Sequence, residues 1–371
     1  MNSKLKDIIL YSSLFIVGNY FMVMGLHRGK EFFIPLVISI LLAMLMVPVE
    51  RKMRQWGIPR GWAALFSDII ILVFCLGLFF IAWMQVKNFA NDWPKLQEKI
   101  KPGIENVQNF IEEKTGISPQ VQQQKITKYI GLDSLGGSDS KEPAIIKSLF
   151  SFSAKFLLVF VYIFFFLFFK DKFRTSTLIF FSRQKRNKVA QIIDKISHIS
   201  QRYLFGKLIL IIFLAIIYSI GLTIVGLKHA IFISIIASIL TLIPYLGNII
   251  GALIAVVMAV LTGDGWEPVI GVIVVFSITQ FFETYFMEPF IIGHKIDLNP
   301  VLTIIGIVAG GAIWNIAGMI LAMPTLGILK VIFDNIPTMQ PIGYLLGEEG
   351  IPKGSNWYKD FEDWIKRKIK K

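Results

Sequence analysis

The feature of this chain that most restricts its fold is a pair of long apolar stretches, residues 230–262 and 301–333, which proline and glycine interrupt. A straight membrane helix needs only about 20 apolar residues, and both stretches are longer than that. Broken helices at membrane depth are tolerated only where the irregular backbone packs inside protein or lines a cavity. The two stretches therefore predict a transporter whose pathway runs beside them.

The composition is typical of an integral membrane protein, with 54% hydrophobic and 17% charged residues. The formal net charge of +13 comes from Lys and Arg between the apolar runs, without the basic and aromatic pattern of nucleic-acid readers. We therefore expect the lipid bilayer as a partner and no nucleic acid. The single cysteine, Cys75, excludes an intrachain disulfide.

The apolar pattern predicts an all-α polytopic integral membrane protein with about eight membrane segments, two of them broken or re-entrant, plus a mostly helical extramembrane insertion. Each half of 230–262 is about 14 residues, or about 21 Å of helix, which is shorter than the hydrocarbon core. This favours a hairpin of half-helices, although span parity also allows crossings. The segments are 8–26, 32–49, 62–84, 149–169, 208–226, 230–262, 268–286 and 301–333.

Loop charge predicts the orientation and the division of the chain. Residues 50–60 carry four basic residues and one acidic residue, and 170–207 carry ten and two, whereas 85–148 carry nine and eight. The basic loops should be cytoplasmic, which places both termini in the cytoplasm. The parts are 1–84 with three spans, 85–148 as a helical extracytoplasmic insertion, 149–169 as the fourth span, 170–207 as a cytoplasmic basic amphipathic helix, 208–334 as the transport core, and 335–371 as a cytoplasmic tail.

Two of these parts carry amphipathic stripes beside basic residues, one before residue 203 and one in the tail after residue 356. A helix of this kind lies at an anionic membrane surface or couples spans mechanically. We favour the membrane surface for both.

Ionisable residues inside membrane segments are costly and usually functional. Asp68 and Lys155 enter their spans from opposite sides, so they should not pair; Lys155 should reach its interface, and Asp68 should accept hydrogen bonds or border an aqueous pocket. Gln280, Glu283 and Thr284 share one helical face. That face predicts either a substrate or proton site or a network that locks the helices together. Glu283 and Asp68 are the candidates for ion coupling.

The first break contains Pro244, Gly247, Asn248 and Gly251. Backbone groups freed there can face an uncharged polar solute, although close packing of Gly251 and its neighbour at Ala255 is the alternative. The second stretch also contains residues that can interrupt a helix, but its sequence signal for a break is less specific. Its candidate residues are Gly306, Gly310, Gly311, Asn315 and Pro324, of which Gly310, Gly311 and Asn315 are predicted to line the pathway.

The chain resembles the autoinducer-2 exporter family, also called the PerM-like family. The resemblance rests on QRYLFGK, IPYLGNIIGALIA, Gln280 with Glu283 before EPFIIG, DLNP, GGAIWNIAGMILAMPTLGILKV and, in the front half, IPLVISILLAMLMVPVERKMR, GIPR and FLFFKDKFR. It implies a multi-span bacterial inner-membrane permease, often oligomeric, that exports autoinducer-2 or another small hydrophilic solute. Some relatives are assigned to sodium/proton antiport. Asn248 departs from the proline that many relatives have there.

We therefore predict a secondary transporter that exports a small hydrophilic solute such as autoinducer-2 by alternating access, in an elevator-like manner, driven by a proton or sodium gradient. The resemblance also implies a homo-oligomer. A sodium(lithium)/proton antiporter and a non-transporting membrane scaffold are the alternatives. No paired acids, nucleophile motif, HExxH or nucleotide loop is present, so we expect no enzyme, cofactor or metal site. His294, Lys295 and Asp297 are interpreted as solvated or gating residues.

Overall fold

The computed structural model describes residues 3–81, 83–84, 112, 118, 142–262, 265–291 and 298–348, with side chains from Leu10 onward and, in α5, from Lys155 onward. All regular secondary structure in these ranges is helical. Most of the insertion 85–148, the loop with His294, Lys295 and Asp297, and the tail stripe lie outside the described residues. The first elements are α1 (Ser3–Arg28), α2 (Lys30–Gln55), a helix at Arg60–Ile81, α5 (Glu142–Ile179) and α6 (Arg183–Ile224).

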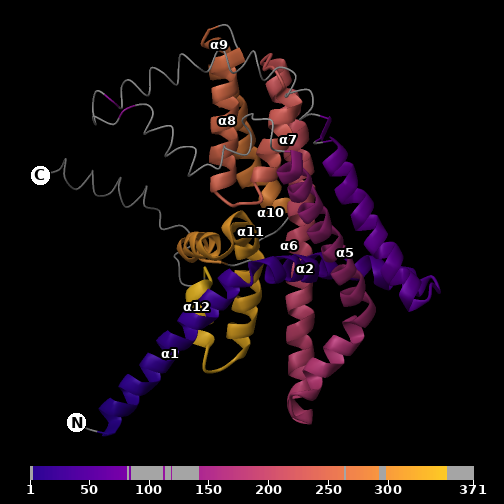
Figure 1. The fold of residues 1–371 in the computed structure, drawn as a ribbon, viewed down its shortest axis with the longest axis vertical. Coiled ribbons are helices and arrows are strands. Elements are labelled where there is room, and N and C mark those ends of the chain that lie inside the picture. The colour runs from indigo at the N-terminus through magenta and orange to yellow at the C-terminus, as the bar shows by residue number, and fades with distance from the viewer. Residues whose placement is uncertain are drawn as a thin grey trace, which may run out of the picture.

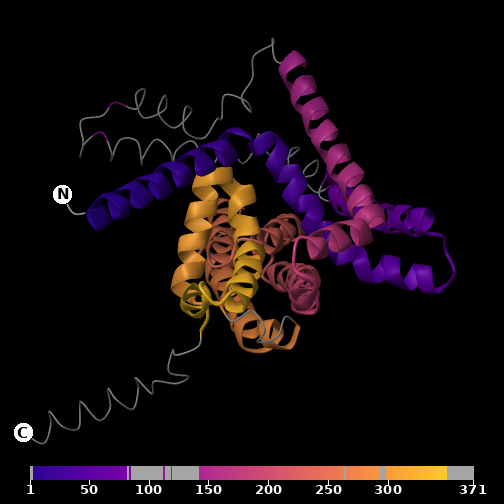
Figure 2. The same cartoon turned by 90° about the horizontal axis from the view of Figure 1, so that it is seen from below.

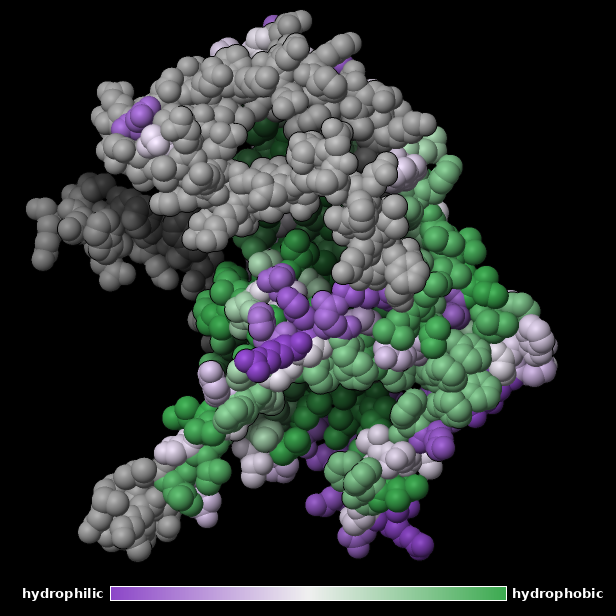
Figure 3. All heavy atoms as spheres, viewed as in Figure 1, coloured by the Kyte–Doolittle hydropathy of each residue, from purple (hydrophilic) through white to green (hydrophobic). Residues whose placement is uncertain are grey.

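Within the described residues, six helices are long and apolar enough to cross a membrane, which confirms the prediction of an all-α polytopic membrane protein. Their outer surface is apolar, as the green atoms of Figure 3 show on one face. Such a surface is compatible with lipid rather than water. The six are Leu10–Arg28, Lys30–Gln55, Arg60–Ile81, Arg183–Ile224, Glu267–Ile291 and Pro300–Asn335.

α5 and α6 are longer than the spans predicted from hydropathy. α5 continues to Ile179, a short turn follows, and α6 then runs as one helix to Ile224. At about 1.5 Å of rise per residue, the 42 residues of α6 cover about 63 Å. Because the basic amphipathic segment 183–203 continues into the apolar segment, the two parts share one axis. The sequence pattern had divided this helix at residue 207, and the position of its basic segment at the membrane surface remains a prediction.

The first broken stretch is a helical hairpin, here called the first hairpin (residues 230–262). It consists of α7 (Ala230–Leu240) and α8 (Leu246–Thr262), joined by a turn in which Tyr245 has φ 63°. A Cβ atom at Gly251 would lie 2.9 Å from that of Ala237, and one at Gly247 would overlap the backbone of Leu240. These contacts bring the two helices side by side in opposite directions, so the chain reverses at residues 241–245.

The second broken stretch also reverses direction and is here called the second hairpin (residues 300–335). α11 (Pro300–Asn335) is interrupted at Trp314 (φ −129°, ψ 21°) and Asn315 (φ 53°, ψ −138°). Gly310 contacts Gly318, and Gly306 faces Leu326, so these pairs are centred on the interruption. The break therefore lies at Trp314 and Asn315 and not at Pro324. The short α12 (Gln340–Leu346) packs against α11.

α9 (Glu267–Phe282) passes without a break into a π-helical turn, η2 (Glu283–Met287), and then α10 (Glu288–Ile291). In Figure 1, α7, α8 and α9 lie beside the upper half of α6, whereas α11 and α12 lie beside the lower part. Figure 2 shows α5 extending away from the orange and yellow helices, and α1 passing across one side of them.

Two main hydrophobic cores hold these elements. One joins α6, α7, α8 and α9, and includes Leu214, Tyr218 and Phe276. The other joins α2, the helix Arg60–Ile81 and α5, with Ile163 and Leu167 fully buried. A small third cluster forms where Ile243, in the turn of the first hairpin, meets Ile307 and Ala322 of the second hairpin. The turn of the first hairpin therefore packs against the limbs of the second hairpin and not against its break at Trp314 and Asn315.

Candidate functional site

The centre of the candidate site is Glu283, which lies at the point where α9 becomes the π-helical turn η2 and is only 3% exposed. The Nδ2 atom of Asn248, near the start of α8, donates a hydrogen bond of 3.0 Å to Glu283 Oε2. Sequence analysis predicted both residues, but in two separate constellations. The structure joins them in one contact between the first hairpin and the α9–η2 element.

Lys207 of α6 is a second buried ionisable residue near this site. It is 6% exposed, and its electrostatic interaction with Glu283 acts over a longer range than an ion pair. An isolated carboxylate is costly to bury, and an opposite charge nearby offsets that cost. The sequence motif QRYLFGK contains Lys207, but no role was predicted for this residue. The signal that could have identified it is a lysine directly before an apolar run.

Two polar atoms near Glu283 have no hydrogen-bond partner among the described residues. They are Asn248 Oδ1 and the hydroxyl of Tyr218, both buried. Tyr218 lies on α6 and interacts electrostatically with Glu283. Its ring stacks on Phe276 of α9, with the ring centroids 4.5 Å apart. A buried polar atom without a partner costs about 1–3 kcal/mol. These two atoms are therefore suited to receive a polar solute or a water molecule.

Gln280 and Thr284 do not join this site. Gln280 Nε2 donates a 3.0 Å hydrogen bond to Thr284 Oγ1, and Thr284 is exposed whereas Glu283 is buried. Adjacent residues in a helix point about 100° apart, so Glu283 and Thr284 cannot both face α8. The predicted polar face is thus divided, with Glu283 inside and the other two residues in a pair at the surface.

The predicted glycines mainly allow close helix approach. Gly247 and Gly251 face α7, and Gly310 faces the backbone of Gly318 across the second hairpin. Gly311 faces Met319 in the same hairpin. Of the other residues predicted to line the pathway, Pro244 is half-buried in the turn of the first hairpin and Asn315 is exposed in that of the second. Their contacts shape the hairpins and do not reach Glu283 directly.

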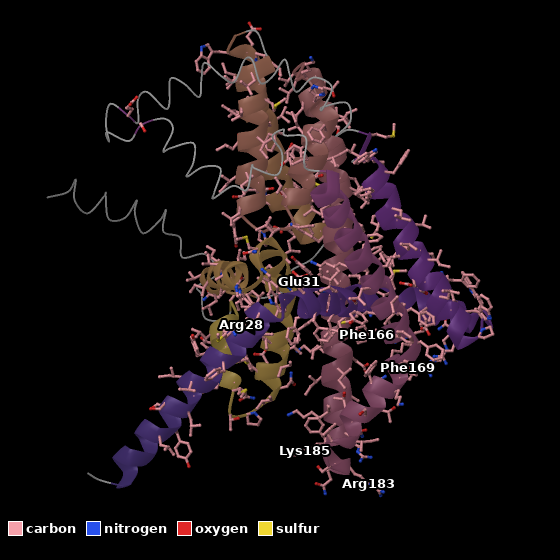
Figure 4. All side chains as sticks on the ribbon, in the orientation of Figure 1. Arg28, Glu31, Phe166, Phe169, Arg183 and Lys185 are labelled. Carbon is pink, nitrogen blue, oxygen red and sulfur yellow. The ribbon has the colours of Figure 1, made fainter. Side chains whose placement is uncertain are left out.

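Asp68 lies apart from Glu283, on the helix Arg60–Ile81. It is 8% exposed, and its Oδ1 atom has no hydrogen-bond partner among the described residues, so the expected bond from a neighbouring helix to that atom is not formed. Lys155 instead forms an ion pair with Glu31, at the α1–α2 junction where Figure 4 labels Arg28 and Glu31. The sequence prediction that Asp68 and Lys155 do not pair agrees with this arrangement.

A second charged cluster brings together the three motifs of the front half. Glu50 of α2, which is fully buried, pairs with Lys170 of α5. Asp171 lies 3.3 Å from Arg54 of α2 and 3.6 Å from Arg60, at the start of the next helix. The network ties α2, the helix Arg60–Ile81 and α5 at one end. Its internally paired charges are typical of a structural junction.

Among the described residues, no group of three or more His, Cys, Asp or Glu side chains is placed to hold a metal ion. The residues of the candidate site are Lys207, Asn248, Tyr218 and Glu283. These residues come from α6, the first hairpin and the α9–η2 element.

The comparisons with known proteins agree with a membrane transporter. A family model described as the AI-2E family transporter matches residues 11–338. YrrI of Bacillus subtilis strain 168 is 27% identical over 327 residues, which cover 84% of this chain and 88% of YrrI. The AI-2 transport protein TqsA of Escherichia coli K12 is 21% identical over 350 residues, covering 93% of this chain and 96% of TqsA. The matched region contains Lys207, Asn248 and Glu283.

Proposed function

The chain belongs to the AI-2E transporter family, as its resemblance predicted, and from this premise we propose that it is a secondary transporter that exports a small hydrophilic solute. The proposed site is formed by Lys207, Asn248, Tyr218 and Glu283. The observation that carries the proposal is the hydrogen bond from Asn248 to Glu283, because it links a helical hairpin to a buried carboxylate. A hairpin attached in this way is able to report on the occupancy of the site.

In this proposal, the two hairpins allow the site to open to one side of the membrane at a time. If both return to the side from which they enter, α1, α2, Arg60–Ile81, α5, α6 and α9 make six crossings. The first hairpin then enters from outside and the second from the cytoplasm, and their contact at Ile243, Ile307 and Ala322 separates the two sides. Elevator-like movement of α6–α9 and the hairpins against α2, Arg60–Ile81 and α5 would expose the site alternately. The separate hydrophobic cores support this division.

The remaining features of the proposal extend the sequence predictions. The protein is a multi-pass protein of the bacterial inner membrane, with both termini in the cytoplasm, and works as a homo-oligomer without acting as an enzyme. A proton or sodium gradient drives export, with Glu283 and Asp68 as the candidate coupling residues. Autoinducer-2 is the first solute to test because TqsA is named as an AI-2 transport protein.

A sodium(lithium)/proton antiporter is the second candidate function. Glu283 and Asp68 are both buried acids, and buried acids in membrane segments often carry ions or protons. They lie on different elements in different cores, however, and so do not form one ion site. A membrane scaffold that does not transport would not account for the two hairpins or for the Asn248–Glu283 contact.

Counterflow in proteoliposomes separates these functions, with autoinducer-2, sodium and a panel of small polar metabolites as probes. We expect a hydrophilic solute to be carried, and Glu283→Gln or Asn248→Ala to lower its rate by roughly tenfold or more, equivalent to losing about 1.4 kcal/mol of binding free energy. Glu267→Gln, an exposed acid at the other end of α9, is the matched control. Sodium–proton exchange that Glu283→Gln abolishes, without solute counterflow, would establish the antiporter instead.

A further inference from the structure

The turn between α5 and α6, together with the helix ends on either side of it, is here called the α5–α6 tip (residues 172–188). In Figure 1 this turn lies at the lower end of α6, away from both hairpins. Its own contacts hold it: the Phe181 N–H donates to Leu178 O at 3.2 Å, and Arg186 Nε donates to Phe181 O at 3.2 Å. The tip is therefore a defined turn at the end of two long helices.

Three consecutive apolar side chains of the tip are exposed. The exposed fractions are 62% for Ile179, 88% for Phe180 and 42% for Phe181. The apolar stripe that follows on α6 is different, because residues such as Ile192 and Ile196 are half-buried and already pack against protein. Adjacent exposed apolar side chains mark a surface that meets lipid or another protein. At this end of α6, that surface is the turn and not the stripe.

The charge around these apolar side chains has one sign. Residues 172–193 carry six Lys and Arg residues and no Asp or Glu. The acid that follows them, Asp194, is already paired with Arg174 at 2.7 Å. Figure 4 labels Arg183 and Lys185 at the lower end of α6, and Figure 3 shows hydrophilic and hydrophobic atoms together at this end. The tip thus presents exposed apolar side chains within a strongly positive surface.

α5 sets the distance of the tip from the membrane core. Its apolar run ends at Lys170 and the helix ends at Ile179, which is about 14 Å further along its axis. The ion pair of Arg174 with Asp194 keeps α6 at the same level. In Figures 1 and 2 the lower end of α5 bends away from the axis of its upper part, so it does not run straight out of the membrane. Because the headgroup layer is about 5–8 Å thick on each side, a bent α5 brings the tip close to this layer.

We propose that the α5–α6 tip docks on the anionic inner leaflet of the membrane, with Phe180 and its apolar neighbours in the headgroup layer and the basic residues beside lipid phosphates. Basic residues around exposed apolar side chains have the chemistry of such a membrane contact. A second copy of the tip would bring the same positive charge and would be repelled. The inference rests on the proposed cytoplasmic side of this turn and not on the solute that is transported.

The test is the depth of a fluorescent probe on the tip of the full chain in lipid nanodiscs. In a Cys75→Ala background, Ser182→Cys, an exposed position beside the aromatic residues, carries the environment-sensitive fluorophore NBD. In nanodiscs with phosphatidylglycerol, spin-labelled lipid should quench the probe and aqueous acrylamide should not. In phosphatidylcholine alone, acrylamide should reach it. Both leaflets of a nanodisc have the same composition, so the result does not depend on the orientation of the chain.

Two substitutions separate the contributions of charge and apolar contact. Arg183→Gln with Lys185→Gln should make the probe severalfold more accessible to acrylamide in phosphatidylglycerol, whereas the exchange Arg183→Lys with Lys185→Arg keeps the charge and should change nothing. Phe180→Ser should also expose the probe, and Phe180→Leu is its matched control.

Three outcomes would overturn the proposal. A probe that acrylamide reaches equally in both lipids would show that the tip projects into water. A probe protected from acrylamide but not quenched by spin-labelled lipid would show that protein covers the tip, either a second copy or another partner. Equal quenching by lipid in both compositions, unchanged by the loss of two charges, would show insertion without recognition of anionic lipid.

Discussion

At the scale of the residue, Asn248 combines a backbone position in the first turn of α8 with a side-chain hydrogen bond to Glu283. It is the third residue of α8, so its side chain points from the first turn of a helix into the interior, and it reaches Glu283 through only one of its two polar atoms. A proline here would keep the start of the helix but leave Glu283 without this donor. The backbone and the side chain of Asn248 therefore have separate roles.

Because the backbone and the side chain of Asn248 have separate roles, the effect of Asn248→Pro can be predicted. Among the described residues the backbone N–H of Asn248 makes no hydrogen bond outside the helix ladder, and proline is tolerated in the first turn of a helix. The variant should therefore fold and lose about 1–3 kcal/mol of unfolding free energy, the cost of removing one hydrogen bond to a buried charged group. Chemical unfolding in detergent measures this loss. Asn248→Ala is the control and should lose a similar amount; a far larger loss for proline would show that the backbone N–H is in use.

The contact between Asn248 and Glu283 shows what could be predicted from single residues. Each was identified because a polar group within an apolar run has a cost, but their contact depends on how α8 and α9 pack, which no local pattern contains. Lys207 received no role because it lies at the boundary of an apolar run, where a lysine usually reaches the interface. Its burial results from the unbroken passage of α6 into the core, which hydropathy alone did not reveal.

At the scale of the element, the second hairpin contains a strained turn. Asn315 has φ 53° and ψ −138°, a conformation that glycine adopts readily and other residues rarely do. The neighbouring residues are fixed to the end of α1, because Trp314 Nε1 donates to Leu26 O at 2.9 Å and His27 Nδ1 lies 2.8 Å from Ile313 O. The end of α1 therefore braces the turn.

We expect Asn315→Gly to stabilise the protein by about 1 kcal/mol, because relief of backbone strain of about 1–3 kcal/mol exceeds the entropy lost by a flexible glycine. Unfolding of the purified variant by heat or denaturant measures the change. Ala312→Gly, an exposed position within the helical limb, is the control and should destabilise by about 0.5–1 kcal/mol. A more stable Asn315→Gly protein with normal counterflow would assign Asn315 to the turn and not to the pathway. Equal destabilisation by both substitutions would contradict the strained turn.

The elements were predicted well where a single apolar run forms a single helix, and less well where one helix contains two kinds of sequence. In α6, a basic amphipathic segment and an apolar segment were separated at residue 207, because periodicity changes there although the backbone does not. In the second hairpin, the glycines gave the possibility of a break but not its place. The break falls at Trp314 and Asn315 because close contact of Gly310 with Gly318 requires the reversal between them.

At the scale of the whole molecule, α6 packs in both main hydrophobic cores, here called the two bodies, and α11 also contacts both α6 and α2. The α6 residues Leu210, Leu214 and Tyr218 belong to the core with the first hairpin, whereas Leu204 and Leu208 also contact the core around α5. The charged network of Glu50, Lys170 and Asp171 fixes the second body at one end. A motion of one body against the other would therefore be concentrated along α6, near Lys207.

The proposed path of the chain through the membrane makes a prediction about its two sides. In a Cys75→Ala background, Lys185→Cys, near the end of α6 that Figure 4 labels, should be cytoplasmic because Arg183, Lys185, Arg186 and Lys188 gather there. Trp266→Cys, exposed before α9, should lie outside, because a first hairpin that returns to its own side leaves residues 265–266 where α6 emerged. A membrane-impermeant maleimide should label Trp266→Cys in intact cells stripped of any outer membrane.

The same reagent should label Lys185→Cys only in inverted vesicles, and the Cys75→Ala background alone serves as the control for both measurements. The two positions decide between the two paths that charge and span parity leave open. Labelling of both cysteines from the cytoplasmic side would mean that the first hairpin, with its short α7 of 11 residues, crosses the membrane once. The hairpins would then lie in series along one crossing path, and their contact at Ile243 and Ile307 would no longer separate two entrances to Glu283.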